Sequence, residues 1–298
     1  MKQKTKEFIT ATRYWSLTAS AIPVIITMSY IFYQKENFQN INWIFGIIAL
    51  IATLLFHLAG NLFNDYFDYK FNVDREDTMS SRMLVDKQFM PKQILIAASS
   101  FLILGISIGI FLTIKTNWSL LIVGILGFLG TVFYNFLKYH ALGDLCIFIV
   151  YGQLISLGMA FVMLNQFYWI IILITVPIGL LIVGILHANN TRDIINDSKA
   201  NIKTFAMILK LKNSKIYFVL LIGLSYLFIL VLIILKILSP LCLLVFISFP
   251  FAKKTFSLML PVKIDELDNI KQLTEIMAKY VLVFGGLLIV ANFIAGLF

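Results

Sequence analysis

The pattern that decides the fold is clearest in residues 167–204, which read FYWIIILITVPIGLLIVGILHANNTRDIINDSKANIKT. The first part, up to Leu186, is uncharged and mostly apolar, and its length matches the ~20 residues that a helix needs to cross a bilayer. The rest changes abruptly to asparagine, aspartate and lysine. The stretch therefore predicts a transmembrane helix that ends in a polar, acid-containing segment.

Apolar runs of this kind recur along the whole chain. Of its 298 residues, 60% are hydrophobic and only 13% are charged, and the mean hydropathy is +0.92. Soluble domains carry roughly 25% charged residues, so the composition excludes an ordinary soluble protein. We expect residues 1–298 to form a single all-α domain, a polytopic membrane bundle of nine transmembrane helices. The runs lie at approximately 15–33, 41–62, 92–114, 118–137, 143–164, 167–187, 215–236, 238–259 and 277–298.

The eighth run is the least regular of the nine. Pro250 and the adjacent pair Lys253 and Lys254 interrupt it. It stays in the count because proline is tolerated in membrane helices where neighbouring groups satisfy the freed carbonyl.

The basic residues support this count and give it a direction. With nine spans the termini lie on opposite sides, and 21 of the 24 Lys and Arg residues then share the side of the N-terminus. The other side receives Lys35, Lys115 and Lys236. Because loops rich in Lys and Arg stay in the cytoplasm, we expect a multi-pass protein of the cell membrane with a cytoplasmic N-terminus. The topology explains the net charge of +9 without a nucleic-acid partner.

Several other classes find no support in the sequence. Cys146 and Cys242 lie in separate apolar runs, which argues against a disulfide framework or a cysteine metal site. The segment from Met1 to Arg13 is basic, and the apolar run after it is long enough to span, so no cleavable signal peptide is expected. No obligate protein partner is evident.

The second apolar run leads into HLAGNLFNDYFDYKFN, residues 57–72. If the helix continues, Asn61, Asn64 with Asp65, and Asp68 recur on one face. Carboxylates on one stripe repel each other unless something positive binds there, and Mg²⁺ takes oxygen ligands. The alternative is a solvated acidic loop at a helix end, which this segment alone does not exclude.

A second segment of the same kind follows the sixth run. Asp193 and Asp197 are again four residues apart on one predicted helical face, with Asn189 one turn earlier. The predicted topology puts this segment on the same cytoplasmic side as the first. Two such stripes facing each other across a cavity supply four carboxylates, enough for two Mg²⁺ ions and a diphosphate. The repetition favours a binding site over two unrelated acidic loops.

Basic residues are interleaved with these acids. Arginine and lysine both bind phosphate, the first as a fork and the second as a point charge. The interleaved residues are Lys70, Arg75, Arg82, Lys138, Arg192 and Lys203. For any single one of them the membrane topology is the simpler explanation. Lys138 is the strongest functional candidate, because it is the only basic residue of a very short loop and follows Tyr134.

The three histidines are weaker candidates. His57, His140 and His187 each stand alone near a helix end. A lone histidine there is more often structural than catalytic, so His57 and His187 are not included in the predicted site.

These motifs together resemble those of the UbiA-type intramembrane prenyltransferases. Asn64-Asp65-x-x-Asp68 and Asp193-x-x-x-Asp197 are similar to the two aspartate-rich motifs of that family, and nine helices agree with it, so the resemblance covers nearly the whole chain. Within the family the sequence most resembles the MenA branch, the 1,4-dihydroxy-2-naphthoate polyprenyltransferases. That finer resemblance is carried by residues 61–74, 81–82, 134–144 and 189–204. One departure is Lys138-Tyr-His-Ala-Leu-Gly-Asp144, where the branch has Lys-Tyr-Arg-Gly-Leu-Gly-Glu.

The resemblance implies an enzyme that depends on Mg²⁺. It would transfer a polyprenyl group from polyprenyl diphosphate to a small aromatic acid, 1,4-dihydroxy-2-naphthoate, with loss of carbon dioxide and formation of demethylmenaquinone, at a cytoplasmic-side cavity. The implied catalytic and metal-binding residues are Asp65, Asp68, Asp193 and Asp197, assisted by Asn64, around two Mg²⁺ ions. The implied diphosphate-binding residues are Asn61, Asn64, Lys70, Arg82, Tyr134, Lys138, Asn189, Arg192 and Lys203.

Two kinds of alternative stay open from the sequence. Within the family the acceptor could instead be 4-hydroxybenzoate, haem, a chlorophyllide or a glycerol phosphate, although Asn72 stands where the 4-hydroxybenzoate branch more often has a third aspartate. An ion-coupled transporter is the alternative of another class, because acids in membrane helices also mark ion pathways. Transporters usually place such sites near the bilayer midplane, whereas these acids stand at helix ends.

Overall fold

The computed structural model describes residues 8–9, 12–73, 83–200 and 202–298. Within these ranges every regular element is a helix, and nine helical spans are long and apolar enough to cross a membrane. The predicted all-α bundle of nine transmembrane helices is therefore confirmed.

The spans consist of long α-helices, some of them extended by a short helix of another type. They are η1 (Tyr14–Leu17) with α2 (Thr18–Tyr33), α3 (Trp43–Lys70), α4 (Pro91–Lys115), α5 (Leu120–Tyr139), α6 (Gly143–Ile147) with η3 (Phe148–Leu154) and α7 (Ile155–Leu164), α8 (Ile170–Arg192), α10 (Phe205–Ile234), η4 (Pro240–Ser248) with α11 (Phe249–Met259), and η5 (Leu267–Ile270) with α12 (Leu273–Ala295). Two short helices, η2 (Lys35–Asn37) and α9 (Ile194–Lys199), lie in connections.

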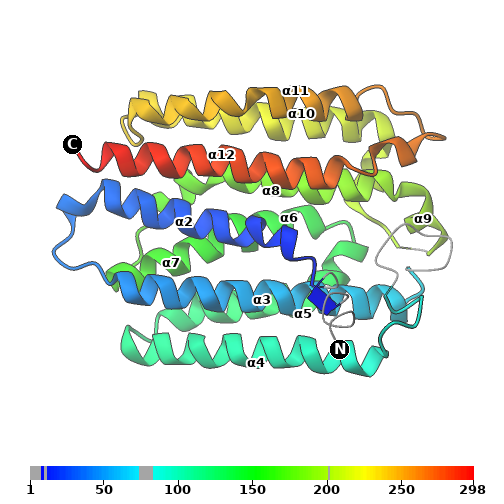
Figure 1. The fold of residues 1–298 in the computed structure, drawn as a ribbon, viewed down its shortest axis with the longest axis horizontal. Coiled ribbons are helices and arrows are strands. Elements are labelled where there is room, and N and C mark those ends of the chain that lie inside the picture. Colours follow the sequence, from blue (N-terminus) through cyan, green and yellow to red (C-terminus); the bar gives the residue numbers. More distant parts are fainter. Residues whose placement is uncertain (1–7, 10–11, 74–82, 201) are drawn as a thin grey trace.

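The spans run roughly along the long axis of the molecule (Figure 1). α3 and α8 end at the same end of the bundle, on the right in that view, and we call it the motif end because both polar segments lie there. The C-terminus lies at the opposite end.

α8 forms the centre of the bundle. It packs against α10, α12 and η3, and Ile171, Ile174 and Ile178 on it are fully buried. Their spacing of three to four residues is that of one helix face. α4 and α5 are the least buried spans, so their apolar side chains face outward, as expected for helices that contact lipid.

Two helices are longer than their apolar runs predict. α3 continues to Lys70 instead of ending near residue 62, because residues 63–70 contain no Gly or Pro to break its hydrogen-bond ladder. α10 begins at Phe205, ten residues before the predicted start at 215, and its backbone bends at Lys210, where φ is 58° and ψ is 164°. The first of these extensions carries Asn64, Asp65 and Asp68.

The fifth and eighth spans change helix type along their length. In the eighth, Pro250 stands in the first turn of α11, where a proline interrupts no helical hydrogen bond. In the fifth, η3 is a π-helical segment, and its Gly152 approaches Gly179 of α8 so closely that a Cβ on Gly179 would lie 3.2 Å from the Gly152 Cα. Two glycines are needed for this contact between backbones.

Candidate active site

A cavity of about 530 Å³ opens among the helices at the motif end. Its polar wall comes from η1, α3, the end of α5, the segment from α8 to α9, and the junction of η5 with α12, where Lys271, Thr274 and Glu275 line it. Its apolar wall includes Ala19, Gly130, Cys146, Ile147, Val150, Ile182, Ile185 and Leu186. The cavity thus joins a charged part to an apolar part inside one bundle.

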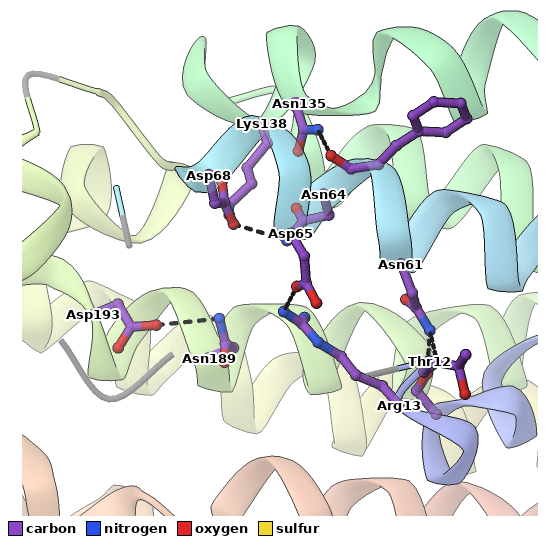
Figure 2. A network of polar contacts seen from close by, with 12 residues as sticks. Thr12, Arg13, Asn61, Asn64, Asp65, Asp68, Asn135, Lys138, Asn189 and Asp193 are labelled. Carbon is purple, nitrogen blue, oxygen red and sulfur yellow. Dashed lines mark hydrogen bonds and ion pairs between the residues drawn. The ribbon is translucent and has the colours of Figure 1, made fainter. Parts of the chain in front are cut away.

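The first cluster, which we define as Asn61, Asn64, Asp65 and Asp68, lies on the extended part of α3 (Figure 2). Asn61, Asn64 and Asp68 line the cavity, as expected for residues three to seven apart on one helix. Asp65 is buried beside them without lining it, and its carboxylate pairs with the guanidinium of Arg13.

Asp68 collects three donors. Asn64 Nδ2 donates to its Oδ2 at 2.7 Å, Lys138 Nζ lies 3.3 Å from the same oxygen, and Tyr139 OH donates to Oδ1 at 2.5 Å. Lys138 is only 7% exposed, so its charge needs a nearby carboxylate. The end of α5 is therefore tied to the end of α3.

The second cluster, which we define as Asn189, Asp193 and Asp197, lies where α8 meets α9. Arg192 donates two hydrogen bonds to Asp193, from Nε to Oδ1 at 2.7 Å and from Nη2 to Oδ2 at 2.6 Å. Asn189 Nδ2 also donates to Asp193 Oδ2, at 3.2 Å. Asp193 stands between the two helices rather than inside one, yet the Asp197 N–H still bonds the Asp193 carbonyl at 2.8 Å. All three residues line the cavity.

Asp197 shows how closely the two clusters act on each other. It is 4% exposed, and burial raises its pKa from 3.8 to about 7. Lys138 opposes this shift of the pKa, while Asp193 and Asp68 add to it by repulsion. Because carboxylates of both clusters act on Asp197, the two clusters share one electrostatic environment.

A backbone contact helps to bring the clusters together. The Lys203 N–H donates to the Tyr139 carbonyl at 3.0 Å, beside a bridge between His140 and Lys203. This contact joins the connection after α5 to the connection before α10, so Lys138 is placed next to the segment that carries Asp197.

The oxygen atoms of the cavity suit a magnesium ion that arrives with a phosphate ligand. Among the described residues, no group of three or more His, Cys, Asp or Glu side chains is placed to hold a metal ion by itself. Mg²⁺ typically uses one or two protein carboxylates and takes its other ligands from water and substrate phosphates. Asp197 receives no hydrogen bond on its carboxylate from a described residue, and the buried Asn190 Oδ1 lacks a partner there too. The donor set therefore fits a shared ion and gives no preformed cage.

Most of the residues singled out in the sequence meet in this cavity. Those that line it are Asn61, Asn64, Asp68, Tyr134, Lys138, Asn189, Arg192, Asp193 and Asp197. Lys70 and Lys203 are exposed and do not line it, and Lys70 instead lies over the ring of Tyr66. Arg82 lies outside the described residues.

Several polar residues of the cavity were missed by reasoning from sequence. Arg13, Ser16, His57, Tyr151 and Asn190 all line it. His57 had a usable signal, since it stands four residues before Asn61 on the same face of α3. Nothing local marks Arg13, which reaches Asp65 across 52 residues of sequence.

Comparisons with known proteins identify the family of this chain. The model of the UbiA prenyltransferase family matches residues 20–262. The chain is 30% identical over 234 residues to UbiA prenyltransferase domain-containing protein 1 of Danio rerio, covering 76% of this chain and 68% of the relative. It is 29% identical over 245 residues to 1,4-dihydroxy-2-naphthoate octaprenyltransferase of Bacillus subtilis, covering 80% and 77%.

Solved structures share the fold at lower identity. A UbiA homologue from Archaeoglobus fulgidus, determined with GPP and Mg²⁺ bound, superposes with a TM-score of 0.65 at 12% identity, covering 95% of this chain and 99% of that one. A structure of digeranylgeranylglyceryl phosphate synthase gives a TM-score of 0.64 at 19% identity, covering 98% and 99%.

Proposed function

We propose that this chain, which belongs to the UbiA prenyltransferase family and is therefore a prenyltransferase, moves a polyprenyl group from polyprenyl diphosphate to 1,4-dihydroxy-2-naphthoate. The observation that carries the proposal is the convergence of two carboxylate clusters with Arg13, Lys138 and Arg192 on one cavity that also has an apolar wall. A polyprenyl diphosphate has a small polyanionic head and a long apolar tail, and such a cavity suits both halves.

The polar wall would bind the head group. Mg²⁺, in our proposal two ions, would supply the positive charge that stabilises the diphosphate as it leaves. Asp65, Asp68, Asp193 and Asp197, with Asn64, are the proposed ligands. The remaining oxygens of the head group would pair with Lys138 and Arg192, whose side chains already lie in the cavity wall.

The apolar wall would protect the reacting carbon. When the allylic C–O bond breaks, its electron pair leaves with the diphosphate and positive charge develops on the prenyl group. Ile182, Ile185 and Val150 line the cavity beyond the clusters and would exclude water from that carbon. An electron-rich ring carbon of the acceptor then forms the new C–C bond, and the ring carboxyl departs as carbon dioxide, giving the reduced, quinol form of demethylmenaquinone.

The choice of acceptor is supported by one relative and by one stretch of sequence. The Bacillus subtilis relative is named for 1,4-dihydroxy-2-naphthoate, and Tyr134 and Lys138 of the matching stretch line the cavity. The acid of that stretch, Asp144, does not line the cavity. Its Oδ2 instead lies 2.9 Å from His187 Nδ1, in a buried hydrogen-bonded pair. We therefore assign Asp144 a structural role and expect the replacement of glutamate by aspartate there to leave the acceptor unchanged.

We also propose that the site opens on the cytoplasmic side of the cell membrane and that residues 1–298 act as one domain. The distribution of 21 of the 24 basic residues on the side of the N-terminus supports the first statement. The packing of α8 against helices near both ends of the chain, α2 and α12, supports the second.

The experiment that tests this function uses the purified protein in lipid nanodiscs. It would receive Mg²⁺, a polyprenyl diphosphate and either 1,4-dihydroxy-2-naphthoate or 4-hydroxybenzoate, with diphosphate release and product mass as the two measurements. We expect release with the naphthoate and a product that has lost carbon dioxide. Diphosphate release only with 4-hydroxybenzoate would contradict the proposed acceptor. If neither acceptor supported diphosphate release, the proposed function would be contradicted.

A further inference from the structure

A chain of hydrogen bonds joins the start of the first span to the first cluster. His57 and Asn61 stand one turn apart on α3, and Ser16 and Ser20 stand one turn apart on the adjoining η1 and α2. His57 Nε2 lies 3.0 Å from Ser16 Oγ, and His57 Nδ1 lies 2.9 Å from Ser20 Oγ. Asn61 Nδ2 donates to Ser16 Oγ at 3.0 Å. His57 is 4% exposed, yet it lines the cavity.

Only one assignment of hydrogens satisfies every group in this network of hydrogen bonds. Ser20 donates its hydroxyl hydrogen to the Leu17 carbonyl at 3.1 Å, so its oxygen accepts from His57 Nδ1. His57 is then the neutral tautomer with a free electron pair on Nε2, and Ser16 donates to that nitrogen. With the opposite tautomer the Ser16 hydrogen would have no acceptor among the described residues.

The same chain fixes the amide of Asn61. Its second Nδ2 hydrogen goes to the Thr12 carbonyl at 2.9 Å, and a carbonyl can only accept (Figure 2). Both hydrogens of Asn61 are thus used, and the group it offers to the cavity is the oxygen Oδ1. An amide oxygen binds a hard cation and repels a diphosphate oxygen.

We propose that His57 is a positioning residue of the prenyl-transfer site, acting through Ser16 to keep the Asn61 oxygen available to a divalent cation. By accepting the Ser16 hydrogen, His57 leaves the Ser16 oxygen as an acceptor for Asn61 Nδ2, which holds the amide with its oxygen turned away from Ser16 and toward the cation. The inference rests on the proposed function, because only a site that binds a cation with diphosphate gives this oxygen a purpose.

The test compares two substitutions of His57, each made in the wild-type chain and in the Asn61→Ala variant. His57→Leu removes the acceptor, whereas His57→Gln keeps an oxygen within reach of Ser16. Binding is measured with Mn²⁺ as a spectroscopic substitute for Mg²⁺, by electron paramagnetic resonance with inorganic pyrophosphate present, beside the Mg²⁺ dependence of turnover. We expect about tenfold weaker binding for His57→Leu, the worth of about one hydrogen bond, and near wild-type binding for His57→Gln.

The backgrounds separate a positioning role from general damage. If His57 acts through Asn61, adding His57→Leu to the Asn61→Ala variant causes no further loss of Mn²⁺ binding. Ser16→Ala, which leaves the buried histidine in place, is expected to match His57→Leu even where the latter folds poorly. His57 also contacts the Tyr151 ring edge at 5.0 Å between centroids, so Tyr151→Leu serves as the control for a role through packing.

A direct readout of the histidine completes the test. The ¹⁵N resonances of His57 are expected to show the neutral form protonated at Nδ1. Protonation at Nε2 would overturn the inference, and so would an equal loss of Mn²⁺ binding from His57→Leu in both backgrounds. In either case an active wild type would leave the proposed function standing. A wild type that neither binds Mn²⁺ with pyrophosphate nor releases diphosphate would overturn both.

Discussion

At the scale of single residues, the cavity is notable for carboxylates that already have partners. Asp65 is held by Arg13, Asp68 by Lys138, and Asp193 by Arg192. Such pairs reduce the cost of burying charge before any ligand is present. The same oxygens are the proposed ligands of Mg²⁺, so removing one has two opposed effects: it frees a cation for diphosphate and takes a ligand from the metal.

We expect the loss of a metal ligand to dominate. Asp68→Ala and Asp193→Ala should each lower kcat by on the order of 10²-fold or more, because each carboxylate would fix an ion that stabilises the leaving group. Diphosphate release at saturating Mg²⁺ is the measurement. Asp265→Ala is the matched control, since Asp265 is exposed between α11 and α12 and should tolerate the change. Full activity in the double variant Asp68→Ala with Asp193→Ala would contradict the assignment.

Asp197 leads to a prediction about pH. Burial raises its pKa to about 7 from 3.8, so the folded protein binds a proton more tightly there than the unfolded chain does. Its contribution to stability is therefore lost as pH rises from about 4 through about 7. Without Mg²⁺, Asp197→Asn should raise the thermal midpoint at pH 8 and leave it nearly unchanged at pH 4. A gain of the same size at both pH values would contradict the prediction.

The residue scale also shows what sequence could and could not anticipate. Lys138 was the strongest basic candidate because of its short loop, and it is buried beside Asp68. Arg13 counted only as one of the charges that set the topology. Its contact with Asp65 depends on how α2 packs against α3, and no spacing along the chain reports that.

At the scale of helices, the apolar runs predicted which helices exist better than they predicted where each helix ends. The nine apolar runs correspond to nine spans in the described part of the chain. The run for α3 stops eight residues before the helix does, because the hydrogen-bond ladder continues into polar residues, and polar residues do not register as hydrophobic. The predicted stripe on α8 is interrupted at Asp193, where the backbone leaves the helix while Arg192 holds the side chain.

The contact between η3 and α8 permits a test at this scale. Gly179→Leu should destabilise the protein by about 1–3 kcal/mol or more, because the added side chain meets the backbone of Gly152 and the Phe148 ring. Thermal unfolding in detergent is the measurement. Gly223→Leu in α10 is the control, since no atom lies within 4 Å of its Cβ position and leucine favours a helix over glycine. Equal effects of the two substitutions would show that the close contact is not limiting.

At the scale of the whole molecule, family membership decides between the classes of function that the sequence left open. Acids at membrane helix ends fit both a transporter and an enzyme, and the match to the UbiA prenyltransferase family selects the enzyme. The side of the membrane on which the site opens stays a prediction, because it rests on the distribution of basic residues.

Labelling of single cysteines would measure that side. Asp265→Cys lies in a connection at the motif end, and Asn37→Cys lies in η2 on an exposed turn at the other end. In intact cells an impermeant thiol reagent should label Asn37→Cys alone, and Asp265→Cys should react only after permeabilisation. The native Cys146 and Cys242 are both buried and should give little background. Labelling in the reverse order would place the cavity outside the cytoplasm.

The paired carboxylates have a thermodynamic consequence for the order of events at the site. In the proposed function, binding there would be an exchange of partners, in which diphosphate takes Lys138 and Arg192 from Asp68 and Asp193 as the metal takes the acids. Either ligand alone must break an ion pair and leave one member uncompensated, whereas the two together leave none. We therefore expect metal and diphosphate to bind with positive and reciprocal cooperativity, so that the site recognises their complex better than either one alone.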